Sequence, residues 1–190
     1  MIKLQYATTA TWTETVLADF DIFLLDHAGA EKKASGMAMS MALHYADKPD
    51  IVATMIDLAI EELDHFREVV KIMAERNLQL KKDDKDLYVN QLRGQLRNGR
   101  EQYFLDRLLL GGVIEARGAE RFGLVAKALP EGSLKSFYID ISESEDRHRD
   151  LFFRLAGNYF PSIEITTRLD ELLEIEAIIV SRLTDRPALH

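Results

Sequence analysis

The sequence predicts an all-α protein, a four-helix bundle made of two antiparallel helical hairpins. Apolar residues recur at helical spacing along most of the 190 residues, as amphipathic helices require. Only four prolines interrupt this pattern, and no segment alternates well enough to be a strand. The third observation is a repeat of ligand-type residues, Glu31–Glu62–His65 and Glu115–Glu145–His148, in which each copy is centred on a predicted turn.

The first hairpin is predicted from the N-terminal part of the chain. Thr11 and Glu14 have the spacing of a capping box at the start of a helical pattern, which has a break near Ala18–Asp19. Asp47-Lys48-Pro49-Asp50 then interrupts the pattern, because such residues favour a turn. An apolar stripe along one face follows from about residue 51. The predicted helices of this half are therefore 11–43 and 51–76.

The second hairpin is predicted after a charged connection. A short helix, 87–98, is weakened by two glycines and lies in this central crossover. A long helix, 102–129, runs up to Pro130, and its partner, 133–155, ends at Gly157-Asn158. A further helix, 170–183, is predicted to be peripheral. The whole chain, 1–190, is predicted to be one domain.

The two predicted turns define the register of the hairpins. The glutamates of the first cluster are equidistant from Ala46–Asp47, and those of the second are equidistant from Pro130. Residues equidistant from the turn of an antiparallel hairpin lie at the same height. The lone glutamate of each cluster should therefore face the Glu-x-x-His pair of its partner helix, about 23 Å from the loop.

The two clusters have the composition of a metal site. A buried carboxylate without a counter-charge is very costly, so such a set on core-facing stripes requires a cation. Four carboxylates and two imidazoles favour two iron ions over zinc, with manganese as the alternative. The predicted catalytic and metal-binding residues are Glu31 and Glu115 as terminal carboxylates, Glu62 and Glu145 as bridges, and His65 and His148 as one imidazole for each metal.

Neighbouring residues leave several alternatives open. His27 lies four residues before the first glutamate and either contacts it or is a core histidine. Glu61 either orients the nearby imidazole or lies on the surface. Gly111-Gly112 either leaves room for dioxygen or allows close helix packing. Arg117 and Arg121 either reach a phosphate or pair with nearby acids.

The composition limits the cofactors, the partners and the cell compartment that can be expected for the protein. The chain has no cysteine, so it can hold neither a disulfide nor a thiolate iron–sulfur cluster. No uncharged run approaches the ~20 residues of a membrane span, and the N-terminus lacks a signal-peptide core. We therefore expect a soluble, cytoplasmic protein with no membrane partner. The formal net charge of -8 argues against DNA binding, although it allows a local basic patch.

Three segments resemble the bacterial tRNA 2-methylthio-isopentenyl-adenosine hydroxylases, a family of the ferritin-like diiron carboxylate proteins. These segments are Leu25–Ala34, Glu61–Phe66 and Ile114–Phe122, and the similarity extends from about Thr11 to the fourth long helix. The resemblance implies a ferritin-like fold and the insertion of one oxygen atom from dioxygen into the isopentenyl group on adenosine 37. It also implies two iron ions in the two clusters, and two electrons supplied by a separate reductase.

A tRNA anticodon stem-loop is the partner that the resemblance implies. The stretch from Leu87 to Arg100 has no acidic residue, and its arginines are spaced to align along one helical face. We expect this face to contact RNA, with a solvated basic face as the alternative. The predicted RNA-binding residues are Arg93, Arg97, Arg100, Lys32 and Lys33.

Other functions on the same fold remain as alternatives. One is a ferritin-like diiron or dimanganese oxidoreductase of the peroxidase or catalase type. Another is an iron-storage protein, which would assemble into a very large shell. A third is a metal-free interaction bundle, whose thermal stability ferrous iron would not change.

Overall fold

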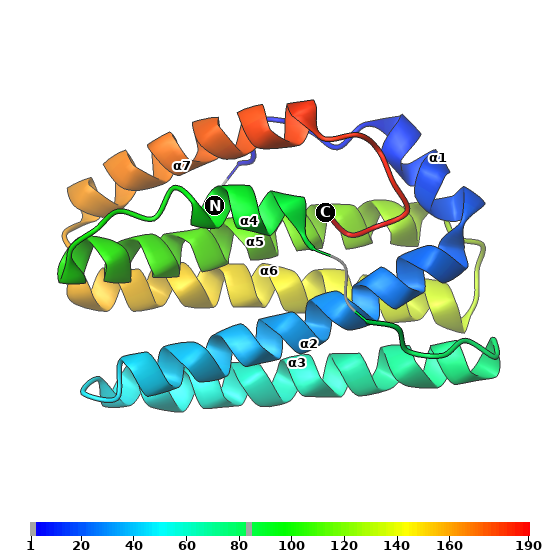
Figure 1. Cartoon of the computed structure of the whole chain (residues 1–190), viewed down its shortest axis with the longest axis horizontal. Helices are drawn as coiled ribbons and strands as arrows, with labels where there is room; N and C mark the ends of the chain where they lie inside the picture. The colour runs from blue at the N-terminus through cyan, green and yellow to red at the C-terminus, as the bar shows by residue number, and fades with distance from the viewer. Residues whose placement is uncertain (1–2, 83–84) are drawn as a thin grey trace. The chain divides into compact units, whose positions relative to one another are not determined.

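The computed structural model describes residues 3–82 and 85–190. Within these two ranges all regular structure is α-helical, as predicted, and Figure 1 shows the order of the elements. The helices are α1 (Ala10–Ala18), α2 (Phe20–His44), α3 (Pro49–Glu75), α4 (Leu87–Arg93), α5 (Arg100–Ala128), α6 (Ser133–Tyr159) and α7 (Ser162–Arg182).

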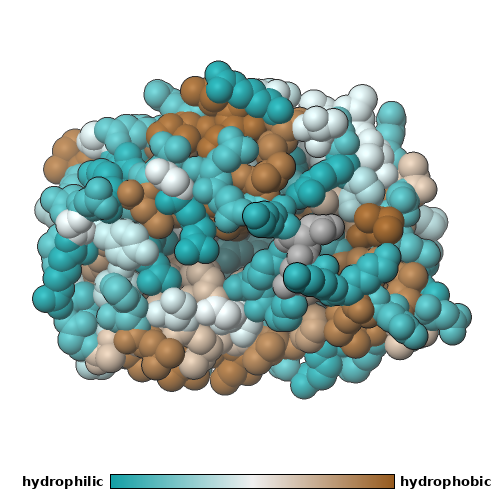
Figure 2. All heavy atoms as spheres, viewed as in Figure 1, coloured by the Kyte–Doolittle hydropathy of each residue, from teal (hydrophilic) through white to brown (hydrophobic). Residues whose placement is uncertain are grey.

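The chain divides into two compact units. The described part of the α2–α3 unit comprises residues 15–82 and 186–189, and that of the α5–α6 unit comprises residues 3–14, 85–185 and 190. The organisation as one domain over residues 1–190 stays a prediction. No helix among the described residues is long and apolar enough to span a membrane. Hydrophilic side chains, teal in Figure 2, cover much of the face drawn there.

The α2–α3 unit is the first predicted hairpin. Helices α2 and α3 lie side by side and antiparallel (Figure 1), joined by residues 45–48. Pro49 begins α3, where its missing N–H costs nothing. Phe23, Leu24, Met41 and Met55 are fully enclosed, so the apolar faces of both helices contribute to the core.

The α5–α6 unit is the second predicted hairpin. Residues 129–132 join α5 to α6, and Gly132 adopts a φ of 154° at the start of α6. Helix α7 packs against α5, and α4 packs against α7. Tyr88, Leu92 and Leu110 form a small apolar cluster with Ile179 and other α7 residues, and this cluster attaches the short helix.

The predicted helix boundaries needed several corrections. The backbone N–H of Trp12 donates to the Thr9 hydroxyl at 3.2 Å, so Thr9 rather than Thr11 caps α1. The break before α2 is confirmed at Asp19. Helix α6 continues through Gly157 to Tyr159, and α7 begins at Ser162 instead of residue 170. Helix α4 ends at Arg93 rather than at residue 98.

Candidate metal centre

One cluster of ligand-type side chains lies inside the α2–α3 unit. Glu31 comes from α2, and Glu62 and His65 come from one face of α3 because residues three apart share a helix face. One ligand atom of each lies within 4.8 Å of the others. The His65 Nδ1 atom is 3.6 Å from an oxygen of each glutamate. The two glutamates are buried, so the hairpin brings together the three residues that the spacing predicted.

The electrostatics of this triad favour a cation. Burial alone would raise the pKa of Glu31, but hydrogen bonds with His27 and His65 hold it well below its usual range. Burial alone would lower the pKa of His65, yet the carboxylates of Glu31 and Glu62 raise it to about 10. The two carboxylates thus stabilise a positive charge on the imidazole. A metal ion would supply that charge and would leave the imidazole neutral, as a ligand must be.

His27 supports the first glutamate of this triad. Its Nε2 atom lies 2.6 Å from Glu31 Oε1, and both side chains are buried. Because an ionised carboxylate only accepts hydrogen bonds, the His27 Nε2–H is the donor. Of the two alternatives drawn from the sequence, the contact with Glu31 is the one observed. Such a hydrogen bond fixes the direction of a carboxylate ligand.

The second cluster lies inside the α5–α6 unit. Glu115 comes from α5, Glu145 and His148 come from α6, and all three are buried. One ligand atom of each again lies within 4.8 Å of the others. Gly118 of α5 faces the Glu145 carboxylate, and a Cβ atom at this position would lie 3.4 Å from Glu145 Oε2. This triad has the same donor set as the first.

A matching pair of cross-helix hydrogen bonds holds the register of both hairpins. The Ser35 hydroxyl on α2 donates to the Ala59 carbonyl of α3 at 2.9 Å. The Ser142 hydroxyl on α6 donates to the Ala119 carbonyl of α5, also at 2.9 Å. In each hairpin the bond lies one helical turn from the glutamates, on the side of the loop. Ser35 lies four residues after Glu31, whereas Ser142 lies three residues before Glu145, so the two serines share no offset in the sequence by which they could have been found.

The glycine pair of α5 serves helix packing. A Cβ atom on Gly111 would lie 2.7 Å from the Phe152 ring, and one on Gly112 would lie 2.5 Å from the Phe153 ring. The two rings of α6 therefore occupy the space that larger side chains on α5 would need. Close helix packing, and not room for dioxygen, is the observed alternative.

The two α5 arginines have structural partners. The Arg117 Nε atom donates to Glu176 of α7 at 2.8 Å, and Arg117 also pairs with Glu120. The Arg121 guanidinium lies 4.8 Å from the centre of the Trp12 ring. Burial, and then repulsion by Arg117, lower the pKa of Arg121 to about 10. Pairing with nearby acids is thus the observed role of Arg117, and both arginines hold parts of the α5–α6 unit together.

The expected basic helical face is not formed. Arg93 is the last residue of α4 and Arg100 is the first of α5, so the segment between them is not one helix. The Arg97 Nη2 atom donates at 2.7 Å to Asp106, a buried carboxylate. The prediction was wrong in its geometry because a carboxylate nine residues further on holds Arg97 outside any helix. Lys32 and Lys33 are exposed on α2.

The structural likeness defines the class of the protein. A solved structure described as "Protein 43 with aldehyde deformylating oxygenase activity from Synechococcus" matches the chain with a TM-score of 0.95 and 33% sequence identity. The match covers 100% of this chain and 96% of that one. With its paired antiparallel helices and its two triads of two glutamates and a histidine, the protein has a ferritin-like fold with carboxylate–histidine ligand sets suited to metal ions.

The family follows from the sequence comparisons. The chain belongs to the family described as tRNA-(MS[2]IO[6]A)-hydroxylase (MiaE), whose model matches residues 2–190. It is 35% identical over 158 residues to a tRNA 2-(methylsulfanyl)-N(6)-isopentenyladenosine(37) hydroxylase of Pseudomonas putida, covering 83% of this chain and 77% of the relative. It is 30% identical over 158 residues to the enzyme of the same name from Salmonella typhimurium, covering 82% of this chain and 56% of that relative. The family resemblance predicted from the three sequence segments is thus confirmed.

Proposed function

We propose that this protein hydroxylates the isopentenyl group of 2-methylthio-isopentenyl-adenosine at position 37 of tRNA. The observation that carries the proposal is the family match over residues 2–190, in a chain that retains both complete triads. The co-substrate is dioxygen, and the site of action is the cytoplasm, where tRNA is found. One oxygen atom enters the substrate, and the other leaves as water with two electrons and two protons from an external donor.

Each triad is proposed to hold one iron ion. The ligands are Glu31, Glu62 and His65 in one unit, and Glu115, Glu145 and His148 in the other. Bridging by Glu62 and Glu145 stays a prediction from the sequence, as does the preference for iron over manganese. The bound metal supplies the capacity to reduce dioxygen, which no side chain has. Since the chain has no cysteine and no flavin or dinucleotide motif, a separate reductase is the proposed source of electrons.

The residues of the chain bind and orient the metals. His27 directs one oxygen of Glu31, and the hydroxyls of Ser35 and Ser142 hold the two helices of each hairpin in register. Burial of the glutamates keeps water from competing for their oxygens. The role of the protein in the reaction is therefore a fixed set of ligands in a dry surrounding.

Mass spectrometry of nucleosides tests the proposal. Substrate tRNA is incubated with the protein, ferrous iron, a reductant and dioxygen, and the modified adenosine should gain one oxygen atom. Glu115→Ala should abolish the gain, whereas Glu101→Ala, at an exposed position near the start of the same helix, should not. Absence of any gain with the iron-loaded protein contradicts the proposal.

A second candidate is the oxygen-dependent deformylation of an aldehyde. It is favoured by the 33% identity over the whole chain to the Synechococcus protein with aldehyde deformylating oxygenase activity. The same preparation is incubated with an aldehyde, and loss of the aldehyde is measured. Loss of aldehyde without oxygen gain on tRNA favours this candidate, and the reverse favours the tRNA hydroxylase.

A further inference from the structure

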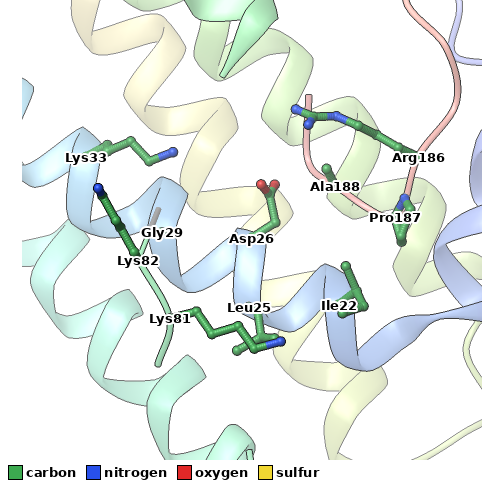
Figure 3. Close-up of a pocket in the computed structure, with 10 residues that line it drawn as sticks. All are labelled: Ile22, Leu25, Asp26, Gly29, Lys33, Lys81, Lys82, Arg186, Pro187 and Ala188. Atoms are coloured by element: carbon green, nitrogen blue, oxygen red, sulfur yellow. The ribbon is translucent and has the colours of Figure 1, made fainter. Parts of the chain in front are cut away.

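A pocket of about 380 Å³ lies on the α2–α3 unit, apart from the ligand triad. Three segments that are distant in the sequence line it: the N-terminal half of α2, the residues after α3, and the chain after α7 (Figure 3). Four of the lining side chains are cationic and one is a carboxylate. They are Lys33, Lys81, Lys82, Arg186 and Asp26.

The charge of this pocket contrasts with that of the chain. The protein carries a formal net charge of -8, yet cations outnumber acids here. In Figure 3, Lys33 and Lys82 lie on one side of the pocket and Arg186 on the other, with Asp26 between them. Such an arrangement of positive side chains around a hollow favours an anion.

Asp26, the carboxylate that lines the pocket, already accepts a hydrogen bond from the C-terminal segment. The Asp26 Oδ2 atom accepts a hydrogen bond of 2.7 Å from the backbone N–H of Leu189. By this bond Asp26 fastens the C-terminal segment to α2 and so positions Arg186, three residues before Leu189. Within the described ranges, Lys33, Lys81 and Lys82 form no ion pair. An anion in the pocket would meet these three lysines.

The pocket lies on the face of α2 opposite the metal ligand. Ile22, Asp26, Gly29 and Lys33 line the pocket at spacings of four, three and four residues, which is one helix face. Glu31 lies two residues from Gly29 and Lys33, or about 200° around the helix. A helix with its side chains is about 10–12 Å across. An anion in the pocket would thus lie on the far side of α2 from Glu31 and would not be a metal ligand.

We propose that this pocket binds a backbone phosphate of the substrate tRNA. The inference rests on the proposed function and adds a positioning site to it. Lysines and arginines that contact phosphate fix the position of a nucleic acid without reading its bases. A phosphate held in this pocket would not compete with the metal for Glu31, because the pocket and Glu31 lie on opposite faces of α2.

The pocket adds residues to the RNA-binding set predicted from the sequence, which stays a prediction. Lys33 belongs to both sets, whereas Arg97 lies outside the pocket and pairs with Asp106. The new members, Lys81, Lys82 and Arg186, come from segments that only the fold brings to α2. The proposed anchor is therefore Lys33, Lys82 and Arg186 around the hollow, with Lys81 at its edge.

Binding of an anticodon stem-loop tests the proposal separately from catalysis. Fluorescence anisotropy of a labelled stem-loop RNA is measured at several salt concentrations between 50 and 200 mM. Lys33→Glu with Lys82→Glu should weaken binding at least about tenfold at modest salt and reduce the magnitude of the slope of log K against log salt by about 1, because the contact with one phosphate is lost. The control, Lys71→Glu with Lys127→Glu, makes the same change in net charge at exposed positions outside the pocket.

Thermal stability and iron content show whether the variants are intact. The thermal stability and the iron content of each variant should match those of the wild type. If Lys33→Glu with Lys82→Glu does not fold, Lys33→Gln with Lys82→Gln takes its place in the binding measurement. Equal RNA affinity of the pocket and control variants, with tight binding by the wild type, overturns the pocket while the proposed function stands. Failure of the wild-type protein to bind any tRNA stem-loop overturns the tRNA substrate itself. Binding of inorganic phosphate in the pocket with no effect of the variants on RNA also overturns the proposal.

Discussion

Replacement of Asp106 with asparagine should lower the stability of the protein strongly. This carboxylate is buried on α5 and accepts hydrogen bonds from two arginines. Arg97 donates from its backbone N–H at 2.8 Å and from Nη2 at 2.7 Å. Arg168 of α7 donates from Nε and Nη2, each at 2.9 Å. Asp106 thus connects the segment before α5 to α7.

The expected magnitude follows from this geometry. Hydrogen bonds to a charged group contribute about 1.5–3 kcal/mol each, and loss of one partner of a buried ion pair costs about 3–5 kcal/mol. Asparagine keeps the shape and one acceptor oxygen of Asp106 but not the charge. We therefore expect a loss of about 3 kcal/mol in the free energy of unfolding. For a chain of this size that corresponds to about 6–12 °C in Tm.

The dependence on pH gives a second test of the same bond network. Burial alone would raise the pKa of Asp106, but the hydrogen bonds from Arg97 and Arg168 lower it below its usual value. A group whose pKa is lower in the folded state adds stability above its unfolded pKa, which is about 3.9, and loses that contribution as the pH falls through the folded pKa. The difference between wild type and Asp106→Asn should therefore be complete at pH 7 and shrink below about pH 4.

Urea unfolding at a series of pH values measures both effects. Asp150→Asn is the matched control, because Asp150 also pairs with an arginine but its side chain is 68% exposed. We expect the control to change stability by less than about 0.5 kcal/mol. A loss below about 1 kcal/mol for Asp106→Asn at neutral pH, or a loss that does not diminish in acid, would refute the reasoning.

Three further changes test packing, register and metal binding. Gly111→Ala should lower the free energy of unfolding by about 1–3 kcal/mol, because its methyl group would lie 2.7 Å from the Phe152 ring. Gly36→Ala should raise it by up to about 1 kcal/mol, because a methyl group there would have nothing within 4 Å. Equal stabilities of the two variants by calorimetry would contradict this packing. Ser35→Ala should cost about 1 kcal/mol in urea unfolding, because it removes the buried bond that joins α2 to α3; an unchanged midpoint would show that the register does not depend on it. Ferrous iron added without oxygen should stabilise the wild type by up to about 2.7 kcal/mol at a hundredfold excess over Kd, and so raise its Tm. Glu115→Ala should reduce this rise in Tm. Equal rises in the two proteins would contradict the assignment of Glu115 as a ligand.

The hairpins were predictable because the repeat marks their turns. The glutamates of each cluster are equidistant from residues 46–47 or from Pro130, and the loops lie at residues 45–48 and 129–132. Both the helical pattern and the ligand spacing depend on local periodicity, which is readable along the chain. The residues that cluster in each triad could therefore be predicted from the sequence alone.

The basic residues were harder to place because their partners are remote. Arg97 looked like part of an exposed helical face, but Asp106 binds it in a segment that is not helical. Conversely, Lys82 and Arg186 are about one hundred residues apart in the sequence and line the same pocket. Periodicity does not report contacts of that kind, since they depend on where whole segments pack.

The two triads share their ligands but differ in their surroundings. Four residues before Glu31 stands His27, whose ring donates a hydrogen bond to that carboxylate. Four residues before Glu115 stands Gly111, which lies against the Phe152 ring instead. Glu31 therefore accepts a hydrogen bond from the residue one turn earlier, whereas the glycine at the matching position of α5 has no side chain that could donate one to Glu115. Because a hydrogen-bond partner of a ligand tunes the affinity for its metal, commonly by about 10–100-fold, we expect the two proposed metal positions to have the same ligand types and different affinities.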